Sequence, residues 1–136
     1  MKESKNAPVP TWNRNLLTAG ALLGIFGIAF GAMGAHPLRE ILSPEELESY
    51  RTAIRYQLFG AITLLILGFV NPPKKSFSRG AYTILLGTSL FSGSIYLLLL
   101  GKHLAFSYSW IGPITPLGGT LLIAGWIFLL WGIRSN

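Results

Sequence analysis

Hydrophobic residues fill four long blocks of this chain, and charged residues lie between the blocks and at the two ends. A helix needs about 20 apolar residues to cross the ~30 Å hydrocarbon core of a bilayer, and it satisfies its own backbone hydrogen bonds there. The pattern therefore predicts an all-α membrane protein, a compact bundle of four transmembrane helices. The uncharged intervals run from Arg14 to His36, from Arg55 to Lys74, from Arg79 to Lys102 and from Leu104 to Ile133.

These intervals predict the domain boundaries. We expect a polar N-terminal tail at residues 1–13 and a single transmembrane domain at 14–136, with spans at about 15–35, 51–70, 80–101 and 115–133. A secretory signal is the competing interpretation of the first span, because Ala32-Met33-Gly34 resembles a cleavage site. The apolar run is too long and the tail too extended for a signal, so we favour a span.

The low content of charged residues affects how the positive net charge is interpreted. Only 12% of the residues are charged, against roughly 25% in an average soluble domain. A net charge of +6 would suggest nucleic acid in a soluble protein, but here the positive residues flank the spans. We therefore attribute them to topology and contact with membrane lipids, and we expect no nucleic acid partner. The chain has no cysteine, which excludes disulfides, thiolate metal sites and cysteine nucleophiles.

The positive residues are distributed unequally between the two membrane faces. Seven belong to the tail, the second loop and the C-terminus: Lys2, Lys5, Arg14, Lys74, Lys75, Arg79 and Arg134. Four belong to the opposite face: Arg39, Arg51, Arg55 and Lys102. Because cytoplasmic loops are enriched in Lys and Arg, both termini are expected in the cytoplasm.

Small residues recur at helix-packing spacing in every predicted span. Glycine spacings of 4, 3, 4 and 3 place five glycines on one face of the first span, and we call this face the glycine seam. Glycine lets another helix approach closely in a bilayer; general glycine enrichment of membrane helices is the competing explanation. The packing residues are Gly20, Gly24, Gly27, Gly31 and Gly34, then Ala53 and Gly60, then Gly80, Gly87, Ser94 and Gly101, and finally Gly118, Gly125 and Gly132.

A polar cap joins the first two spans. Pro37 suits the first turn of a short helix that would lie in the membrane interface. Ser43 and Glu46 then form a capping box, which predicts one helix from this point to about Val70. Thr115, followed by a proline, is expected to cap the fourth helix in a similar way.

The cap also contains the candidate polar or ligand-binding cluster. Two arginines four residues apart repel each other on one helix face, so each needs a partner, and Glu48 is well placed for Arg51. In one interpretation the arginines bind an anion or substrate together with neighbouring polar residues. In the favoured alternative they reach the lipid headgroups and pair with the acidic turn. The candidate cluster is His36, Glu48, Arg51, Arg55, Tyr56 and Gln57.

Other chemistry finds little support in the residues. The chain has two histidines, His36 and His103, and no aspartate, and neither a zinc nor a haem spacing is present. No carboxylate lies within a predicted span, which argues against an Asp/Glu proton relay. We therefore expect no metal, no cofactor and no catalytic residue, and we interpret His36 as a hydrogen-bonding residue at a helix end.

Several motifs occur in a fixed order from about residue 16 to 132. They are Gly31-Ala32-Met33-Gly34-Ala35-His36, Leu42-Ser43-Pro44-Glu45-Glu46-Leu47, Thr52-Ala53, Tyr56-Gln57, Phe91-Ser92-Gly93-Ser94-Ile95-Tyr96, Ile114-Thr115-Pro116-Leu117-Gly118-Gly119 and Ala124-Gly125-Trp126. In these motifs the chain resembles the membrane family called domain of unknown function 423, whose eukaryotic relatives are named transmembrane protein 256. The family pattern usually has a histidine where this chain has Gly60, which weakens any mechanism that needs two histidines. The resemblance implies a small bacterial inner-membrane or mitochondrial-type protein without an assigned activity.

Three functions are compatible with these observations. The favoured one is a non-enzymatic packing or accessory subunit, or a lipid-contacting scaffold, whose partners are lipids, copies of itself or other membrane subunits. The alternative is a small oligomeric carrier or channel for an anionic or polar solute, with Arg51 and Arg55 at its entrance. The third is an enzyme or redox subunit that uses His36.

Overall fold

The computed structural model describes residues 12–70, 74–104 and 109–135. Within these ranges the chain forms four long helices, two short 3-10 helices and no strand. All four long helices are long and apolar enough to cross a membrane, so the predicted four-helix membrane fold is confirmed. Residues 1–11 of the predicted tail lie outside the described residues. The helices are α1 (Arg14–Ala35), η1 (Pro37–Glu40), α2 (Pro44–Val70), α3 (Lys75–His103), η2 (Ser109–Ile111) and α4 (Ile114–Arg134).

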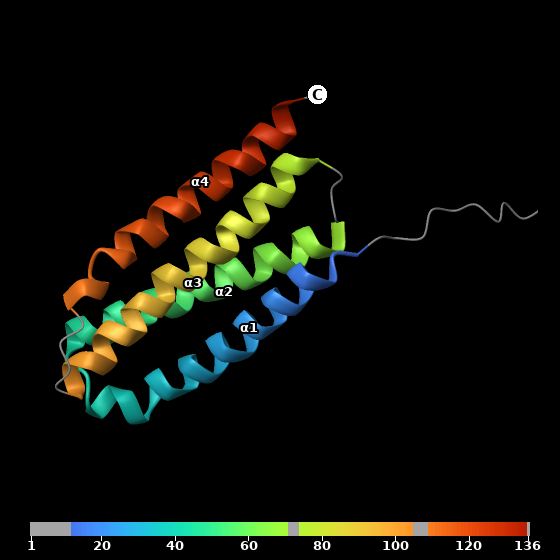
Figure 1. The fold of residues 1–136 in the computed structure, drawn as a ribbon. Helices are drawn as coiled ribbons and strands as arrows, with labels where there is room; N and C mark the ends of the chain where they lie inside the picture. Colours follow the sequence, from blue (N-terminus) through green and yellow to red (C-terminus); the bar gives the residue numbers. More distant parts are fainter. Residues whose placement is uncertain (1–11, 71–73, 105–108, 136) are drawn as a thin grey trace, which may run out of the picture.

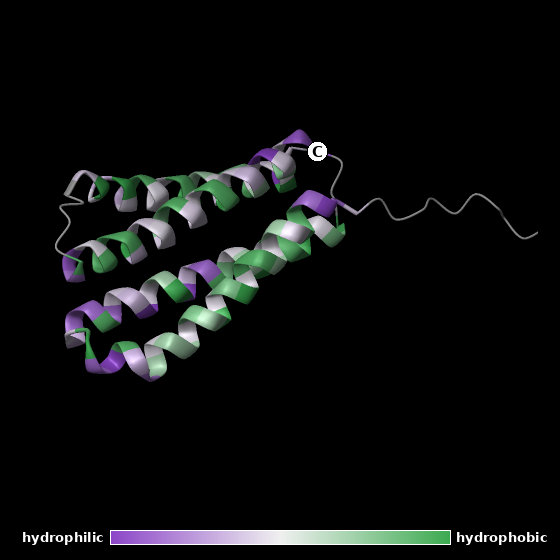
Figure 2. Cartoon of the chain, turned by 60° about the horizontal axis from the view of Figure 1, so that its bottom comes forward, coloured by the Kyte–Doolittle hydropathy of each residue, from purple (hydrophilic) through white to green (hydrophobic). Residues whose placement is uncertain are grey.

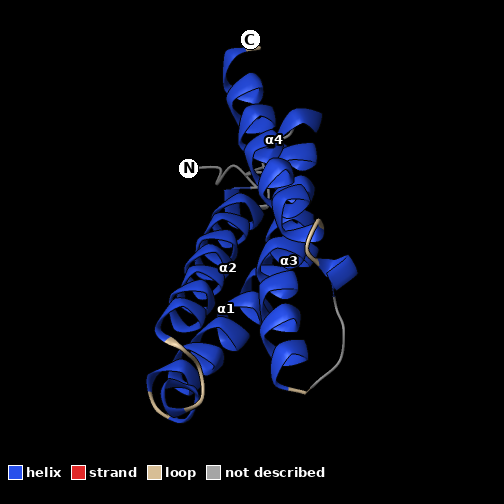
Figure 3. Ribbon diagram, turned by 90° about the vertical axis from the view of Figure 1, so that its left-hand side faces the viewer, coloured by secondary structure: helices blue, strands red, loops and turns tan. Residues whose placement is uncertain are grey.

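The long helices form two hairpins, α1 with α2 and α3 with α4, which meet through α2 and α3 (Figure 1). The outer helices have fewer neighbours, because α1 packs mainly on α2 and α4 mainly on α3. A second view shows α4 alongside α3 and away from α1 (Figure 3). Hydrophilic residues gather at the two ends of the helices and apolar residues fill the stretch between them (Figure 2). This distribution fits a bundle that lies across a bilayer.

The glycine seam packs on α2, and its glycines differ in how closely α2 approaches. A Cβ atom added at Gly20 would lie 2.9 Å from the backbone oxygen of Ala61. At Gly27 and Gly34 it would lie 2.7 Å from side-chain atoms of α2. At Gly24 and Gly31 the nearest atoms are 4.0 and 3.9 Å away, which is ordinary contact. The close approach therefore recurs at every seventh residue.

Backbone-to-backbone contact also joins α3 to α4. A Cβ atom added at Gly87 would lie 2.8 Å from the backbone nitrogen of Leu122, and one added at Gly125 would lie 2.5 Å from the Ile84 side chain. The hydroxyls of Ser94 and Thr115 meet at 2.7 Å across the same interface. The small residues predicted on these two helices therefore lie at a helix–helix contact, as packing in a bilayer favours.

The structure confirms one predicted helix cap and corrects another. The Ser43 hydroxyl accepts from the Glu46 N–H at 3.3 Å, and the Glu46 carboxylate accepts from the Ser43 N–H at 2.9 Å, which is a capping box. The prediction for Thr115 is wrong. The fourth helix begins one residue earlier, at Ile114, so the Thr115 hydroxyl lies inside the first turn and bonds to Ser94 instead.

The short helix predicted between the first two spans is a single 3-10 turn, η1, with proline in its first turn. Its side chains are partly or fully exposed. Its location in the membrane interface stays a prediction.

Candidate functional site

A polar network lies between α1, α2 and α3, in the apolar middle of the bundle. Gln57 on α2 is 4% exposed. Its side-chain Nε2 donates to the backbone oxygen of Leu23 at 2.9 Å, and its Oε1 accepts from the Tyr96 hydroxyl at 2.8 Å. One amide therefore connects three helices. Burying an amide without partners in an apolar medium costs several kcal/mol, and both ends of this side chain are bonded.

The glycine seam makes this contact possible. Each side chain of a helix points toward the N-terminus and covers the turn before it. A glycine four residues after a carbonyl leaves that carbonyl uncovered. Gly27 follows Leu23 by four residues, and the Leu23 oxygen accepts from Gln57. Gly34 follows Phe30 in the same way, and the Phe30 oxygen accepts from the Tyr50 hydroxyl at 2.7 Å.

The two contacts are repeats of one unit. Leu23 and Phe30 are seven residues apart on α1, and Gln57 and Tyr50 are seven apart on α2 in the opposite direction. One further step toward the start of α1 brings Leu16 and Leu64 together in an apolar cluster. The tyrosine rings extend the network to α3, because the Tyr50 and Tyr96 ring centroids are 5.4 Å apart.

The contact between α2 and α3 carries two further hydroxyls. Ser92 donates to the backbone oxygen of Ala53 at 2.8 Å. Thr88 is fully buried, and its hydroxyl has no hydrogen-bond partner among the described residues. A Cβ atom added at Gly60 would lie 2.7 Å from the Thr88 methyl group. Gly60 therefore leaves room for Thr88, and any larger residue there would push α2 away from α3.

The predicted cluster does not come together as one site. Glu48 pairs with Arg55 and, at 4.0 Å, with Arg51, and all three side chains are more than half exposed. Such exposed pairs contribute about 0.2–1 kcal/mol. Tyr56 lies on the same outer side, with its ring 4.7 Å from that of Phe91.

The other members of the cluster lie elsewhere. Gln57, the residue after Tyr56, points into the bundle. His36 is exposed beside η1, in a depression that Arg39 and Glu40 also line. The structure therefore joins the predicted Glu48–arginine group and separates Gln57 and His36 from it.

A second ion-pair group at the same end was not anticipated. Lys102 at the end of α3 approaches the Glu46 carboxylate at 2.5 Å, and His103 approaches it at 3.4 Å. Glu46 lies in the first turn of α2, before the predicted span that begins near residue 51. The Lys102 ammonium and the Ser43 N–H lower the pKa of the Glu46 carboxyl to about 2. Glu46 thus has two roles: it completes the capping box of α2 and it forms an ion pair with Lys102 at the end of α3.

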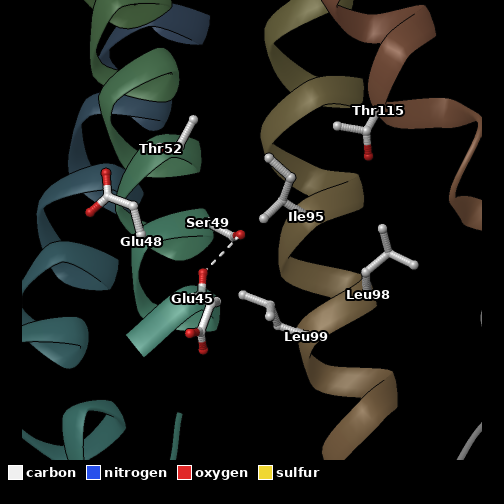
Figure 4. Close-up of a pocket in the computed structure, with 8 residues that line it drawn as sticks. All are labelled: Glu45, Glu48, Ser49, Thr52, Ile95, Leu98, Leu99 and Thr115. Carbon is white, nitrogen blue, oxygen red and sulfur yellow. Dashed lines mark hydrogen bonds between the residues drawn. The ribbon is translucent and has the colours of Figure 1, made fainter. Parts of the chain in front are cut away.

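Two pockets are lined by residues of α2, α3 and α4. They lie at successive positions along the helices, with α2 on one side, α4 on the other and α3 between them. The first, about 660 Å³, lies between the start of α2 and the C-terminal part of α3 and reaches Thr115. Figure 4 shows Ser49 of α2 directed toward Ile95 and Leu99 of α3, with the Glu48 side chain directed away from α3. The second, about 520 Å³, begins at Arg55 and continues toward the middle of the helices. We call the two pockets together the α2–α4 groove.

Among the described residues, no group of three or more His, Asp or Glu side chains is placed to hold a metal ion. Four apolar helices tied by interhelical hydrogen bonds, with ion pairs at the end where α2 begins and α3 ends, define a small multi-pass membrane protein. The comparisons with known proteins agree with this class. Residues 30–119 match the family described as "Protein of unknown function (DUF423)". The chain belongs to that family.

The relatives cover most of the chain. It is 40% identical over 121 residues to a UPF0382 membrane protein of Haemophilus influenzae, covering 85% of this chain and 90% of the relative. It is 35% identical over 124 residues to the UPF0382 inner membrane protein YgdD of Escherichia coli K12, covering 88% and 89%. It is 34% identical over 112 residues to a membrane protein of Staphylococcus haemolyticus, covering 82% and 88%. No solved structure is significantly similar.

Proposed function

We propose that this protein is a non-enzymatic accessory subunit or lipid-contacting scaffold of the bacterial inner membrane. The observation that carries the proposal is the use of the buried polar groups. Gln57, Tyr96, Tyr50 and Ser92 are each bonded to another helix. Their polar atoms serve helix association, which in a bilayer relies on such bonds and on close packing.

The outer helices supply surfaces for partners. Because α1 packs mainly on α2 and α4 mainly on α3, both expose apolar side chains along most of their length. Examples are Ile25 and Ile28 on α1 and Ile123 and Trp131 on α4, each more than 60% exposed. Lipids, copies of this chain or another membrane subunit are the partners that these faces fit.

The charges support cytoplasmic termini in this proposal. Where the described residues approach the two termini, five cations and no carboxylate occur: Arg14, Lys74, Lys75, Arg79 and Arg134. The opposite end holds four cations and the four described glutamates. Lys and Arg are enriched on the cytoplasmic side. A cysteine introduced at Ser135 should react with a membrane-impermeant maleimide only after the cells are opened, and labelling of intact cells would reverse the orientation.

The proposal is tested by purifying the native protein in a gentle detergent and identifying by mass spectrometry what accompanies it. We expect a stoichiometric membrane-protein partner or a defined homo-oligomer. Gly27→Leu should weaken that association, because pushing α2 away from α1 within the chain also moves the outer face of α1 that a partner would contact, whereas Arg51→Ala should keep it. A monomer with the same properties in both variants would contradict the subunit role.

The carrier alternative has one specific observation in its favour, the pocket that begins at Arg55 and runs along α2. Purified protein in liposomes would then move a small anion faster than empty liposomes do. Arg51→Ala together with Arg55→Ala would abolish that flux, while the accessory role predicts no flux in either protein.

A further inference from the structure

The α2–α4 groove follows one face of each helix that borders it. Its α2 residues recur at intervals of three and four from Glu45 to Thr63, which places them on one side of an α-helix. Its α4 residues recur in the same way from Thr115 to Trp126. The two pockets therefore lie end to end along the bundle, with α3 as their floor.

Charged side chains border the outer part of the groove, and apolar side chains line both of its pockets. Glu45, Glu48 and Arg55 lie at the outer end. Beyond Arg55 the walls are largely aromatic and aliphatic, with Phe59 and Trp126 on opposite sides. The eight helical steps from Arg55 to Thr63 span about 12 Å of helix, close to half of the ~30 Å hydrocarbon core. The groove thus has the polarity and length of one lipid chain in one leaflet.

The charges at the outer end are of both signs. Glu48 pairs with Arg55 on the exposed side of α2, and Glu45 lies one turn earlier. An exposed ion pair is weak, so a ligand that carries both charges can replace it. A guanidinium binds phosphate through two parallel hydrogen bonds, and a primary ammonium offers three donors to carboxylates. A zwitterion with a phosphate and a primary ammonium matches this arrangement.

We propose that the α2–α4 groove binds one phospholipid with a phosphoethanolamine headgroup. Arg55 holds the phosphate, Glu48 and Glu45 hold the ammonium, and one acyl chain lies between α2 and α4. The inference deepens the lipid-contacting part of the proposed function and rests on it only for the membrane setting. A negative lipid result would leave the partner-association test unaffected, and a monomeric protein could still bind the lipid.

The test measures lipid selectivity of the full chain by native mass spectrometry. The protein is equilibrated in micelles with equal amounts of phosphatidylethanolamine, phosphatidylglycerol and phosphatidylcholine of the same acyl chains. We expect one phosphatidylethanolamine per chain, retained about tenfold over the other two, which corresponds to one charge-assisted hydrogen bond. Equal retention of all three lipids, or a preference for phosphatidylglycerol, would overturn the proposal.

Two glycine variants test whether the lipid lies in the groove. A Cβ atom at Gly119 meets the Phe91 ring at 3.7 Å, an ordinary contact, so Gly119→Leu fills the groove without a backbone clash. Gly93, on α3, has no atom of the described part of the chain within 4 Å of its Cβ position and is the matched control. Gly119→Leu should lower phosphatidylethanolamine retention about tenfold and Gly93→Leu should not. If Gly119→Leu instead breaks a dimer and leaves lipid retention unchanged, the groove belongs to a second copy.

Charge variants test the headgroup contacts. Glu45→Gln with Glu48→Gln should remove the preference over phosphatidylglycerol, because the ammonium loses both negatively charged partners. Arg55→Gln should weaken retention of all three lipids, because each of them carries a phosphate. Arg39→Gln changes an exposed arginine of η1 outside the groove and is the matched control. All four residues are exposed, so these variants should fold. Unchanged selectivity in the groove variants would refute the assigned contacts.

Discussion

The hydrogen bond between Tyr96 and Gln57 allows a direct test of the buried network. Tyr96→Phe removes one hydroxyl and leaves the Gln57 oxygen without its donor, 2.8 Å from where that hydroxyl was. Gln57→Leu removes that bond and also the bond to Leu23 at 2.9 Å. Interhelical bonds in membrane proteins are worth about 0.6 kcal/mol on average and at most about 1.7. We therefore expect Tyr96→Phe to cost about 0.6–1.7 kcal/mol of unfolding free energy, and Gln57→Leu roughly twice as much.

The double variant distinguishes this explanation from simple loss of packing. Once Gln57 is leucine, the Tyr96 hydroxyl has lost its partner, so its removal should cost nothing further and the coupling energy should be about 0.6 kcal/mol or more. Unfolding by SDS titration in mild detergent, followed by helicity, supplies the free energies. Tyr56→Phe is the matched control, because Tyr56 is 47% exposed. Strict additivity, within about 0.3–0.5 kcal/mol, would refute the coupled network.

Three further predictions use the same unfolding assay. Gly20→Ala should destabilise by about 1–3 kcal/mol because its methyl meets the α2 backbone, whereas Gly24→Ala should be neutral or stabilising, and equal effects would contradict the spacing of the close approaches. Thr88→Val should stabilise by about 1 kcal/mol because it removes a buried hydroxyl that has no partner in the described ranges; destabilisation would show that the hydroxyl does have one. Glu46 has a lowered pKa, so its contribution should be fully present above its ordinary value of 4.5 and be lost as the pH falls toward 2. Glu46→Gln should flatten that pH dependence, and an unchanged profile would exclude the ion pair with Lys102.

The sequence predicts the four helices well because length and hydropathy decide them in a bilayer, where few alternatives satisfy the backbone. It also predicts the face of α1 that packs. It does not predict that Gly24 and Gly31 have ordinary contacts while the other three glycines of the seam are tight, because that depends on which α2 residues lie opposite. Leu58 lies opposite Gly27 and Tyr50 opposite Gly34, and neither pairing can be read from α1 alone.

In the candidate site, too, the contacts within one helix can be predicted from the sequence, and the contacts between helices cannot. The approach of Glu48 to Arg51 follows from their spacing of three residues within α2, and the structure has it at 4.0 Å. The closer pair of Glu48 with Arg55, two helical turns away, was not predicted. The separation of Gln57 from them is a tertiary effect. Successive helix residues point about 100° apart, and only the positions of α1 and α3 decide that Gln57 is the inward one. One available signal was missed: Tyr50 lies seven residues before Gln57 on the same face, which is the spacing of the seam.

The close approaches of α1 to α2 recur every seven residues. The glycines alone therefore do not determine how far α2 is shifted along α1. Sliding α2 by seven residues would again place side chains over gaps in the seam, at little packing cost. The polar groups remove this ambiguity. In the observed register the Leu23 carbonyl accepts from Gln57 and the Phe30 carbonyl accepts from Tyr50. If α2 moved by seven residues in either direction, one of these two carbonyls would lie opposite an apolar residue or a residue at the end of α2. Tyr96 on α3 adds a third constraint, because it meets Gln57 only at this register. Polar residues at single positions are known to fix helix register in this way, and here they explain why an amide is retained in the apolar interior.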